Sequence, residues 1–201
     1  TLSRIISMAR KDFKVISEWV KKDSRILDLG CGDGALLKLL SKERNGSGYG
    51  VDTSIDKIMK SLDNNINVIN ADINNKLDYF SDDSFDYVIL AQSLQVVNNP
   101  VDLIKEMLRI GNEVIISFPN MGYWKSRFYL FLKGRMPVTS ELPYSWHSTP
   151  NIHLCTIKDF KQICHTNNFT IVDEVISSSK GSTVSSSLSN LLGESAIFKV
   201  R

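Results

Sequence analysis

The stretch that most constrains the fold is residues 25–40, RILDLGCGDGALLKLL. A short apolar run leads into glycines at positions 30, 32 and 34, and leucines then recur at helical spacing. This order predicts a strand, a tight glycine turn and a helix. Glycines at alternate positions permit positive φ and let a ligand approach the backbone. Because the free N–H groups of the helix point at the same place, the turn is a predicted ligand site.

The chemistry of the turn narrows the ligand. Gly30, Gly32 and Gly34 are spaced one residue more tightly than the glycines of the dinucleotide fingerprint, and Asp28 and Asp33 flank them. Two carboxylates would repel a pyrophosphate and attract a ligand that carries an ammonium and a sulfonium. We therefore expect S-adenosylmethionine or S-adenosylhomocysteine here, with Cys31 inside the turn. The alternative is a glycine-rich αβ turn that binds nothing.

Residues 49–52 predict a second short strand that ends at Asp52. In Rossmann-type sheets, an acidic residue about twenty positions after the glycine turn hydrogen-bonds a ribose diol. Asp52 is in that place, and Thr53 follows it. The alternative role for Asp52 is an N-cap of the next helix, although Thr53 and Ser54 can also cap that helix.

Later strands bring further candidates to the same edge of the sheet. Residues 66–69 predict a third strand, after which Asp72 can accept from an adenine amine while Ile73 packs on the ring. A surface turn is the alternative role for Asp72. The apolar run 85–90 is typical of a parallel strand that is covered on both faces, and it delivers Gln92 to the carboxyl edge.

The repeated strand and helix alternation predicts a doubly wound, mostly parallel Rossmann-like α/β sheet. Residues 170–176 and 196–200 predict two late strands that can pair as an antiparallel edge ribbon. Residues 11–21 predict an amphipathic helix with a structural role. The 201 residues fit a single domain. Between the late strands, the serine-rich residues 177–189 predict a flexible loop.

Residues 119–155 are rich in aromatic side chains and are interrupted by prolines. A helix is predicted within them over residues 123–133. The segment is a lid, a substrate platform or a docking surface, and extra core packing accounts for only part of its aromatic content. His147 and His153 in this segment are the candidate catalytic bases, each of which is otherwise a structural histidine.

Composition excludes several classes of function. A formal net charge of +2, with scattered basic residues, gives no reason to expect nucleic acid or an anionic membrane as a partner. No apolar run is long enough to span a bilayer and no signal-peptide pattern is present, so the cytoplasm is the expected location. Cysteines at 31, 155 and 164, without a Cys-x-x-Cys pair, argue against a disulfide framework and a zinc site.

The motif at residues 28–34 and the acidic residue Asp52 resemble those of class I S-adenosylmethionine-dependent methyltransferases. A closer resemblance, to the MetW family, comes from the segments RILDLGCGDG, SFDYVIL, QSLQ, ISFPN, GRMPVT and PNIHLCTI. That family often has glutamate at the ribose position, where this chain keeps a carboxylate in Asp52. The resemblance implies a methyltransferase-like fold and a role in methionine biosynthesis with a homoserine O-acyltransferase as partner.

Two functions remain open at this point. One is a methyltransferase acting on a small acceptor, which needs the acceptor held in line with the methyl group. The other is a binding subunit that docks a biosynthetic enzyme through its aromatic segment. The absence of a clear base and the family resemblance favour the binding subunit. An aromatic segment that lies exposed, rather than closed over the ligand, would favour docking.

Overall fold

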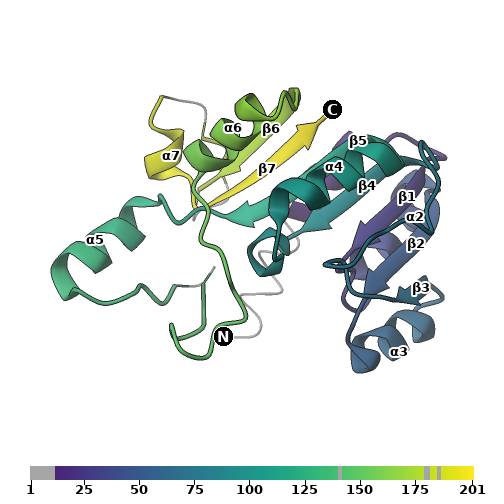
Figure 1. The fold of residues 1–201 in the computed structure, drawn as a ribbon, viewed down its shortest axis with the longest axis horizontal. Coiled ribbons are helices and arrows are strands. Elements are labelled where there is room, and N and C mark those ends of the chain that lie inside the picture. The colour runs from purple at the N-terminus through teal and green to yellow at the C-terminus, as the bar shows by residue number, and fades with distance from the viewer. Residues whose placement is uncertain (1–11, 140–141, 179–181, 185–186) are drawn as a thin grey trace.

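A computed structural model describes residues 12–139, 142–178, 182–184 and 187–201. Its centre is a seven-stranded sheet in the order β3-β2-β1-β4-β5-β7-β6 (Figure 1). The strands are β1 (Arg25–Leu29), β2 (Ser47–Asp52), β3 (Asn67–Asn70), β4 (Phe85–Ala91), β5 (Gly111–Pro119), β6 (Ile171–Ser177) and β7 (Ser195–Val200). The strands from β3 to β5 pair in parallel, whereas β7 is antiparallel to both β5 and β6. The predicted fold class and the antiparallel edge ribbon are confirmed.

Helices cover both faces of this sheet. The helices after β1 are α2 (Ala35–Arg44), α3 (Ile55–Asp63), α4 (Pro100–Ile110), α5 (Trp124–Lys133), α6 (Ile157–Thr166) and α7 (Ser189–Leu192), with a 3-10 turn η1 (Leu94–Val96). Residues 12–19, within the helix predicted over 11–21, are also helical, and residue 11 lies outside the described residues. No helix in the described part of the chain is both long enough and apolar enough to cross a membrane.

Two buried clusters lie on opposite faces of the sheet. On one face, Ile16 and Val20 of the first helix pack with the leucines of α2 against alternate residues of β1, β4 and β5. On the other face, α4 and α6 pack against the intervening residues of the same strands. Phe118, Phe160 and Phe198 form the aromatic centre of this second cluster, with ring centroids 4.7 to 5.9 Å apart. This two-sided burial explains the continuous apolar run of β4.

Local sequence signals set several helix ends. Asn99 accepts from the backbone N–H of Asp102, and Pro100 occupies the first turn of α4. Thr156 and Asp159 form the reciprocal capping box that the sequence predicts at the start of α6.

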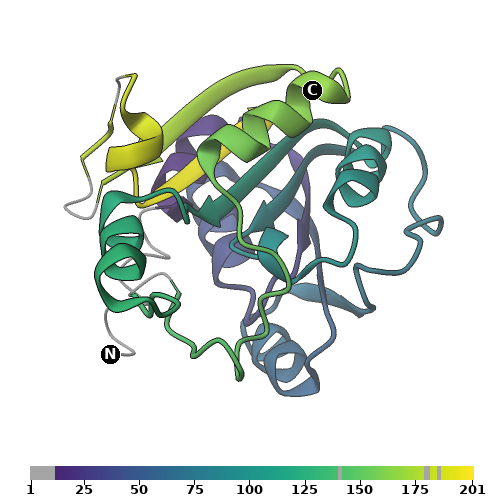
Figure 2. The ribbon, with the colours of Figure 1, turned by 60° about the vertical axis from the view of Figure 1, so that its left-hand side comes forward.

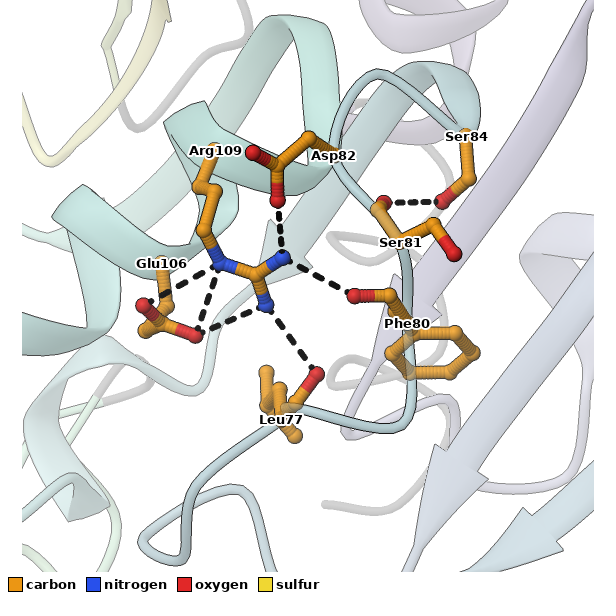
Figure 3. A network of polar contacts seen from close by, with 7 residues as sticks. All are labelled: Leu77, Phe80, Ser81, Asp82, Ser84, Glu106 and Arg109. Carbon is orange, nitrogen blue, oxygen red and sulfur yellow. Dashed lines mark hydrogen bonds and ion pairs between the residues drawn. The ribbon is translucent and has the colours of Figure 1, made fainter.

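Arg109, near the end of α4, holds the long connection between β3 and β4 (Figure 3). Its guanidinium donates to the carbonyl oxygens of Leu77 and Phe80, at 3.2 and 2.9 Å, and pairs with the carboxylates of Asp82 and Glu106. These carboxylates raise the pKa of Arg109 further above its already high ordinary value. The planar fork of arginine can bind several acceptors at once, which a lysine cannot do. Arg109 therefore fixes the middle of the connection between β3 and β4 to α4.

The aromatic segment begins where β5 ends. The predicted helix within it is present as α5, and Ser126 is the buried residue of that helix. Figures 1 and 2 show α5 standing away from the sheet, beyond the end of β5, while the chain that follows passes along the carboxyl ends of the parallel strands before it enters α6.

The serine-rich segment is more regular than predicted in the parts that the structure describes. The N–H of Val184 donates to the carbonyl oxygen of Ile176 at 2.7 Å, and Thr183 forms a bridge with Ser177. Ser189 begins α7 rather than ending a loop. Backbone hydrogen bonds therefore supply the order that the serine composition does not. Residues 179–181 and 185–186 of this predicted loop lie outside the described residues.

Candidate ligand-binding site

The glycine turn between β1 and α2 is held against β2. The N–H groups of Gly30 and Cys31 both donate to the carbonyl oxygen of Val51, at 2.7 and 3.0 Å. A Cβ at Gly30 would lie 2.8 Å from the Ser93 hydroxyl oxygen, so only glycine allows this close approach. At Gly32, φ is +59° and an added Cβ would meet nothing within 4 Å. Gly32 therefore combines a left-handed backbone with open space above it, as a ligand cradle requires.

Asp52, at the end of β2, connects the turn to the next helix. Its side chain is 8% exposed, and its two carboxylate oxygens accept from the N–H groups of Gly32 and Ser54, each at 2.9 Å. The N-cap residue of α3 is Ser54, not Asp52. Because a carboxylate oxygen has two lone pairs, these bonds leave room for further donors such as ribose hydroxyls.

Asp28 lies in β1, in the interior of the sheet, and is 2% exposed. Burial and then the nearby charge of Asp52 raise the pKa of Asp28 to about 8. Burial, followed by the same two carboxylates, also raises the pKa of the Cys31 thiol to about 12. Cys31 is therefore a protonated thiol at neutral pH and is not an activated nucleophile. An arriving cation would favour the ionised form of Asp28.

A cleft of about 320 Å³ opens beside the turn. Its lining includes five of the predicted site residues, namely Gly30, Asp52, Thr53, Asp72 and Ile73, together with Val51, Lys57, Ala71, Asn74, Ser93 and Val96. Strand ends and their following loops supply this lining, because the carboxyl ends of β1, β2, β3 and β4 meet there.

Asp72 forms the turn that the sequence analysis gave as its alternative role, and it also lines the cleft. One of its carboxylate oxygens accepts from both the backbone N–H and the side-chain amide of Asn74, each at 2.9 Å, which forms a tight turn. The same side chain belongs to the cleft wall. The role of Asp72 as an acceptor for a ligand stays a prediction.

The remaining predicted residues lie around the cleft rather than in its wall. Asp28, Cys31 and Gly32 belong to the strand and turn already described. Gly34 is the N-cap of α2, and a carboxylate oxygen of the exposed Asp33 accepts from the N–H of Ala35 at 3.2 Å. Gln92, with φ of +53°, directs its amide to the carboxylate of Asp12 at 2.5 Å and to the hydroxyl of Ser117 at 3.3 Å.

Asp12 is a residue that the sequence analysis missed. It is 4% exposed, and burial raises its pKa to about 6 even though hydrogen bonds from Gln92 and Ser117 oppose the shift. It lies close to the ends of β4 and β5, because Gln92 follows β4 and Ser117 belongs to β5. The available signal was its spacing, since Asp12 stands four residues before Ile16 and therefore on the buried stripe of its helix.

The two candidate bases lie outside the cleft. A ring nitrogen of His153 is 3.3 Å from the carbonyl oxygen of Asn98. The ring of His147 packs edge-on against Trp146, with centroids 5.6 Å apart. Their assignment as bases stays a prediction.

The chain matches the family model described as methionine biosynthesis protein MetW over residues 10–200. It belongs to the MetW family. It is also 38% identical, over 82% of its length, to the bifunctional methionine biosynthesis protein MetXA/MetW of Rhodopirellula baltica. This resemblance was correctly predicted from the segments between residues 25 and 159.

More distant similarities place the MetW fold among methyltransferases. Over 61% of its length the chain is 32% identical to a demethylmenaquinone methyltransferase of Staphylococcus haemolyticus. An S-adenosylmethionine-dependent methyltransferase from Thermotoga maritima superimposes with a TM-score of 0.70 at 14% identity, covering 98% of this chain and 90% of that one. The chain spans 28% of the Rhodopirellula protein and 56% of the Staphylococcus enzyme.

Proposed function

We propose that this MetW-family protein binds S-adenosylmethionine or S-adenosylhomocysteine in the cleft and acts in methionine biosynthesis as a binding partner of a homoserine O-acyltransferase. The observation that carries the proposal is the set of large exposed apolar side chains on the aromatic segment, none of which lines the cleft.

The cleft suits the ligand. Its volume of about 320 Å³ is at the lower end of the range for small-molecule sites. Asp52 would accept from the ribose hydroxyls, and Asp72 would accept from the adenine amine while Ile73 contacts the ring. Asp28, behind the turn, would ionise when a cationic ligand arrives and would then supply negative charge to it. This arrangement favours a cationic nucleoside over a pyrophosphate.

We call the exposed face of residues 124–139 and 142–154 the docking surface. Its most exposed large side chains are Phe131, at 83%, and Trp146, at 75%. Trp124, Phe128, Leu132 and Tyr144 are also exposed. Soluble monomers rarely present so many large apolar side chains together unless they bind something.

The charge of the docking surface indicates which kind of partner surface is complementary to it. Between positions 124 and 135 the sequence contains Lys125, Arg127, Lys133 and Arg135 and no acidic residue. Aromatic and arginine side chains are typical anchors of protein interfaces. A complementary partner therefore offers apolar pockets with an acidic rim.

The identity of the partner rests on the MetW family. The Rhodopirellula relative carries MetXA and MetW in one name, and this chain matches 28% of it. Two modules joined in one chain meet at a high effective concentration, so their separate counterparts need an interface to achieve the same association. A homoserine O-acyltransferase is the partner that the resemblance implies.

The test is a double variant, Trp124→Ala with Trp146→Ala, titrated against the homoserine O-acyltransferase of the same host. We expect binding to weaken by at least about 2 kcal/mol, or roughly 30-fold, if both side chains are interface anchors. Affinity for S-adenosylmethionine should stay at the wild-type value. Tyr79→Ala, which removes an exposed aromatic ring elsewhere, is the matched control. Unchanged acyltransferase binding by the double variant would remove the docking surface from the proposal.

A second candidate function is methyl transfer to a small acceptor, and Asp12 is the observation that favours it. A buried carboxyl with a pKa of about 6 is mostly ionised at neutral pH and suits a general base. Its contact with Gln92 places it near the carboxyl edge of the sheet. Formation of S-adenosylhomocysteine by the wild type in the presence of host metabolites, lost in Asp12→Asn, would put this function first.

A further inference from the structure

We infer that occupancy of the cleft strengthens binding at the docking surface, through a hydrogen-bonded connection between the two. This inference rests on the proposed function and adds its regulation. The connection consists of a strap, defined as residues 150–155, the turn over residues 92–98, and Asn74.

The strap is attached to η1, whose neighbouring residues line the cleft. The N–H groups of Ile152 and His153 both donate to the carbonyl oxygen of Gln95, at 2.8 and 3.0 Å. Gln95 lies in η1, between Ser93 and Val96, which are both part of the cleft lining. The side-chain amide of Gln95 in turn donates to the carbonyl oxygen of Gln92 at 2.8 Å.

The other end of the strap returns to the start of the aromatic segment. The carbonyl oxygen of Cys155 accepts from the N–H of Met121 at 2.9 Å. Three residues after Met121, α5 begins and presents the first anchors of the docking surface. The strap is thus bonded at one point to η1, beside the cleft, and at another to Met121, shortly before α5.

A second route starts at Asp72 in the cleft. Asn74 donates twice to Asp72 and accepts, through its side-chain oxygen, from the N–H of Asn98 at 2.7 Å. The carbonyl oxygen of Asn98 then contacts the His153 ring nitrogen at 3.3 Å. The Asn74 side chain therefore links the turn at Asp72 to Asn98, shortly after η1, and Asn98 in turn contacts His153 of the strap.

The Arg109 network gives this second route a fixed support (Figure 3). Because Arg109 holds the carbonyl oxygens of Leu77 and Phe80, the connection after β3 is anchored beyond residue 76. A ligand that engages Asp72 acts on the short span between the end of β3 and this anchor. Asn74 lies in that span.

The sign of the coupling follows from exposure. The bonds that link Asp72, Asn74 and Asn98 lie at exposed positions, and polar links of that kind open at low free-energy cost. A ligand that contacts Asp72 and the wall at Ser93 orders both routes. The partner then binds a strap that is already ordered, which gives positive cooperativity. The effect is reciprocal, so the partner must strengthen ligand binding by the same factor.

The experiment measures acyltransferase affinity for the full chain without and with saturating S-adenosylhomocysteine, which occupies the cleft and cannot donate a methyl group. We expect roughly fivefold tighter acyltransferase binding with the ligand present, the lower end of typical couplings. Ile152→Pro removes one of the two N–H donors to Gln95 and should bring this ratio close to one. Ile152→Ala shortens the side chain but keeps the backbone N–H that donates to Gln95, so this variant should retain the wild-type ratio.

The outcomes separate this inference from the proposed function. If wild-type protein binds both ligand and acyltransferase but the ratio is one or lower, the coupling is refuted and the proposed function stands. If the ratio is near five in wild type and in both Ile152 variants, with His153→Ala also unchanged, the strap does not carry the coupling and the inference fails. If S-adenosylhomocysteine or the acyltransferase does not bind, both proposals fall.

Discussion

Replacing Asp28 by Asn tests whether burial keeps the carboxyl of Asp28, just before the turn, protonated near neutral pH. Asp28 has a pKa of about 8 in the folded chain and an ordinary value of 3.8 when exposed. Between these values the folded state holds one proton more than the unfolded state. The free energy of unfolding therefore falls as pH rises, by about 1.4 kcal/mol per pH unit from this group. The stabilising contribution is complete below pH 3.8 and is lost as pH passes through about 8.

The expected result is a pH-dependent difference between two proteins. From pH 6 to pH 8, Asp28→Asn should gain about 2 kcal/mol of stability relative to wild type, because the amide never ionises. Above pH 9 the difference should stay constant. Urea denaturation at pH 6, 7, 8 and 9 measures it, with Asp33→Asn, which changes an exposed carboxylate of the same turn, as the control. Parallel curves for wild type and Asp28→Asn would show that Asp28 is ionised throughout and would refute the burial argument.

Two further substitutions address the proposed ligand contacts. Asp52→Ala should weaken S-adenosylmethionine binding by about 30- to 1000-fold, since two charge-assisted bonds to the ribose are worth roughly 2 to 4 kcal/mol. The same substitution should lower the free energy of unfolding by about 1 to 3 kcal/mol, because the N–H groups of Gly32 and Ser54 lose their acceptor. Calorimetry and urea denaturation measure the two effects, and normal ligand affinity would remove the ribose assignment. Gly32→Val should give a folded protein without ligand binding, because φ of +59° strains a β-branched residue and its side chain enters the open space of the turn; retained affinity would show that the ligand does not approach Gly32.

The sequence predicted the parts of the fold that depend on local pattern. The glycine turn, the apolar run of β4 and the capping box of Thr156 and Asp159 are each complete within a few residues, so their geometry can be inferred from spacing. The pairing of the two late strands as an antiparallel edge ribbon was also predicted. The helix α5 was also predicted, whereas the sequence left open whether it is exposed or closes over the ligand.

Contacts between distant segments could not be predicted in this way. Asp12 meets Gln92 across 80 positions, and the guanidinium of Arg109 reaches the carbonyl oxygen of Leu77 across 32. Neither pairing has a signal in spacing, since each depends on how α4 and the first helix lie on the sheet. The helix that contains Asp12 was therefore given only a structural role, and the strap that connects His153 to Gln95 was not foreseen. These unforeseen contacts carry the second candidate function and the coupling.

The two buried acidic residues beside the glycine turn, Asp28 and Asp52, are not the residues that stability alone would favour there. Asp52 accepts hydrogen bonds from the N–H groups of Gly32 and Ser54, and these bonds offset much of the free-energy cost of burying its carboxylate. Asp28 lies close enough to Asp52 for that charge to raise its pKa, and an apolar residue in its place would avoid the cost of ionisation. A carboxyl that is destabilising near neutral pH becomes favourable only when positive charge arrives next to it. The pair therefore points to a cationic ligand at the turn, and this argument is independent of family membership.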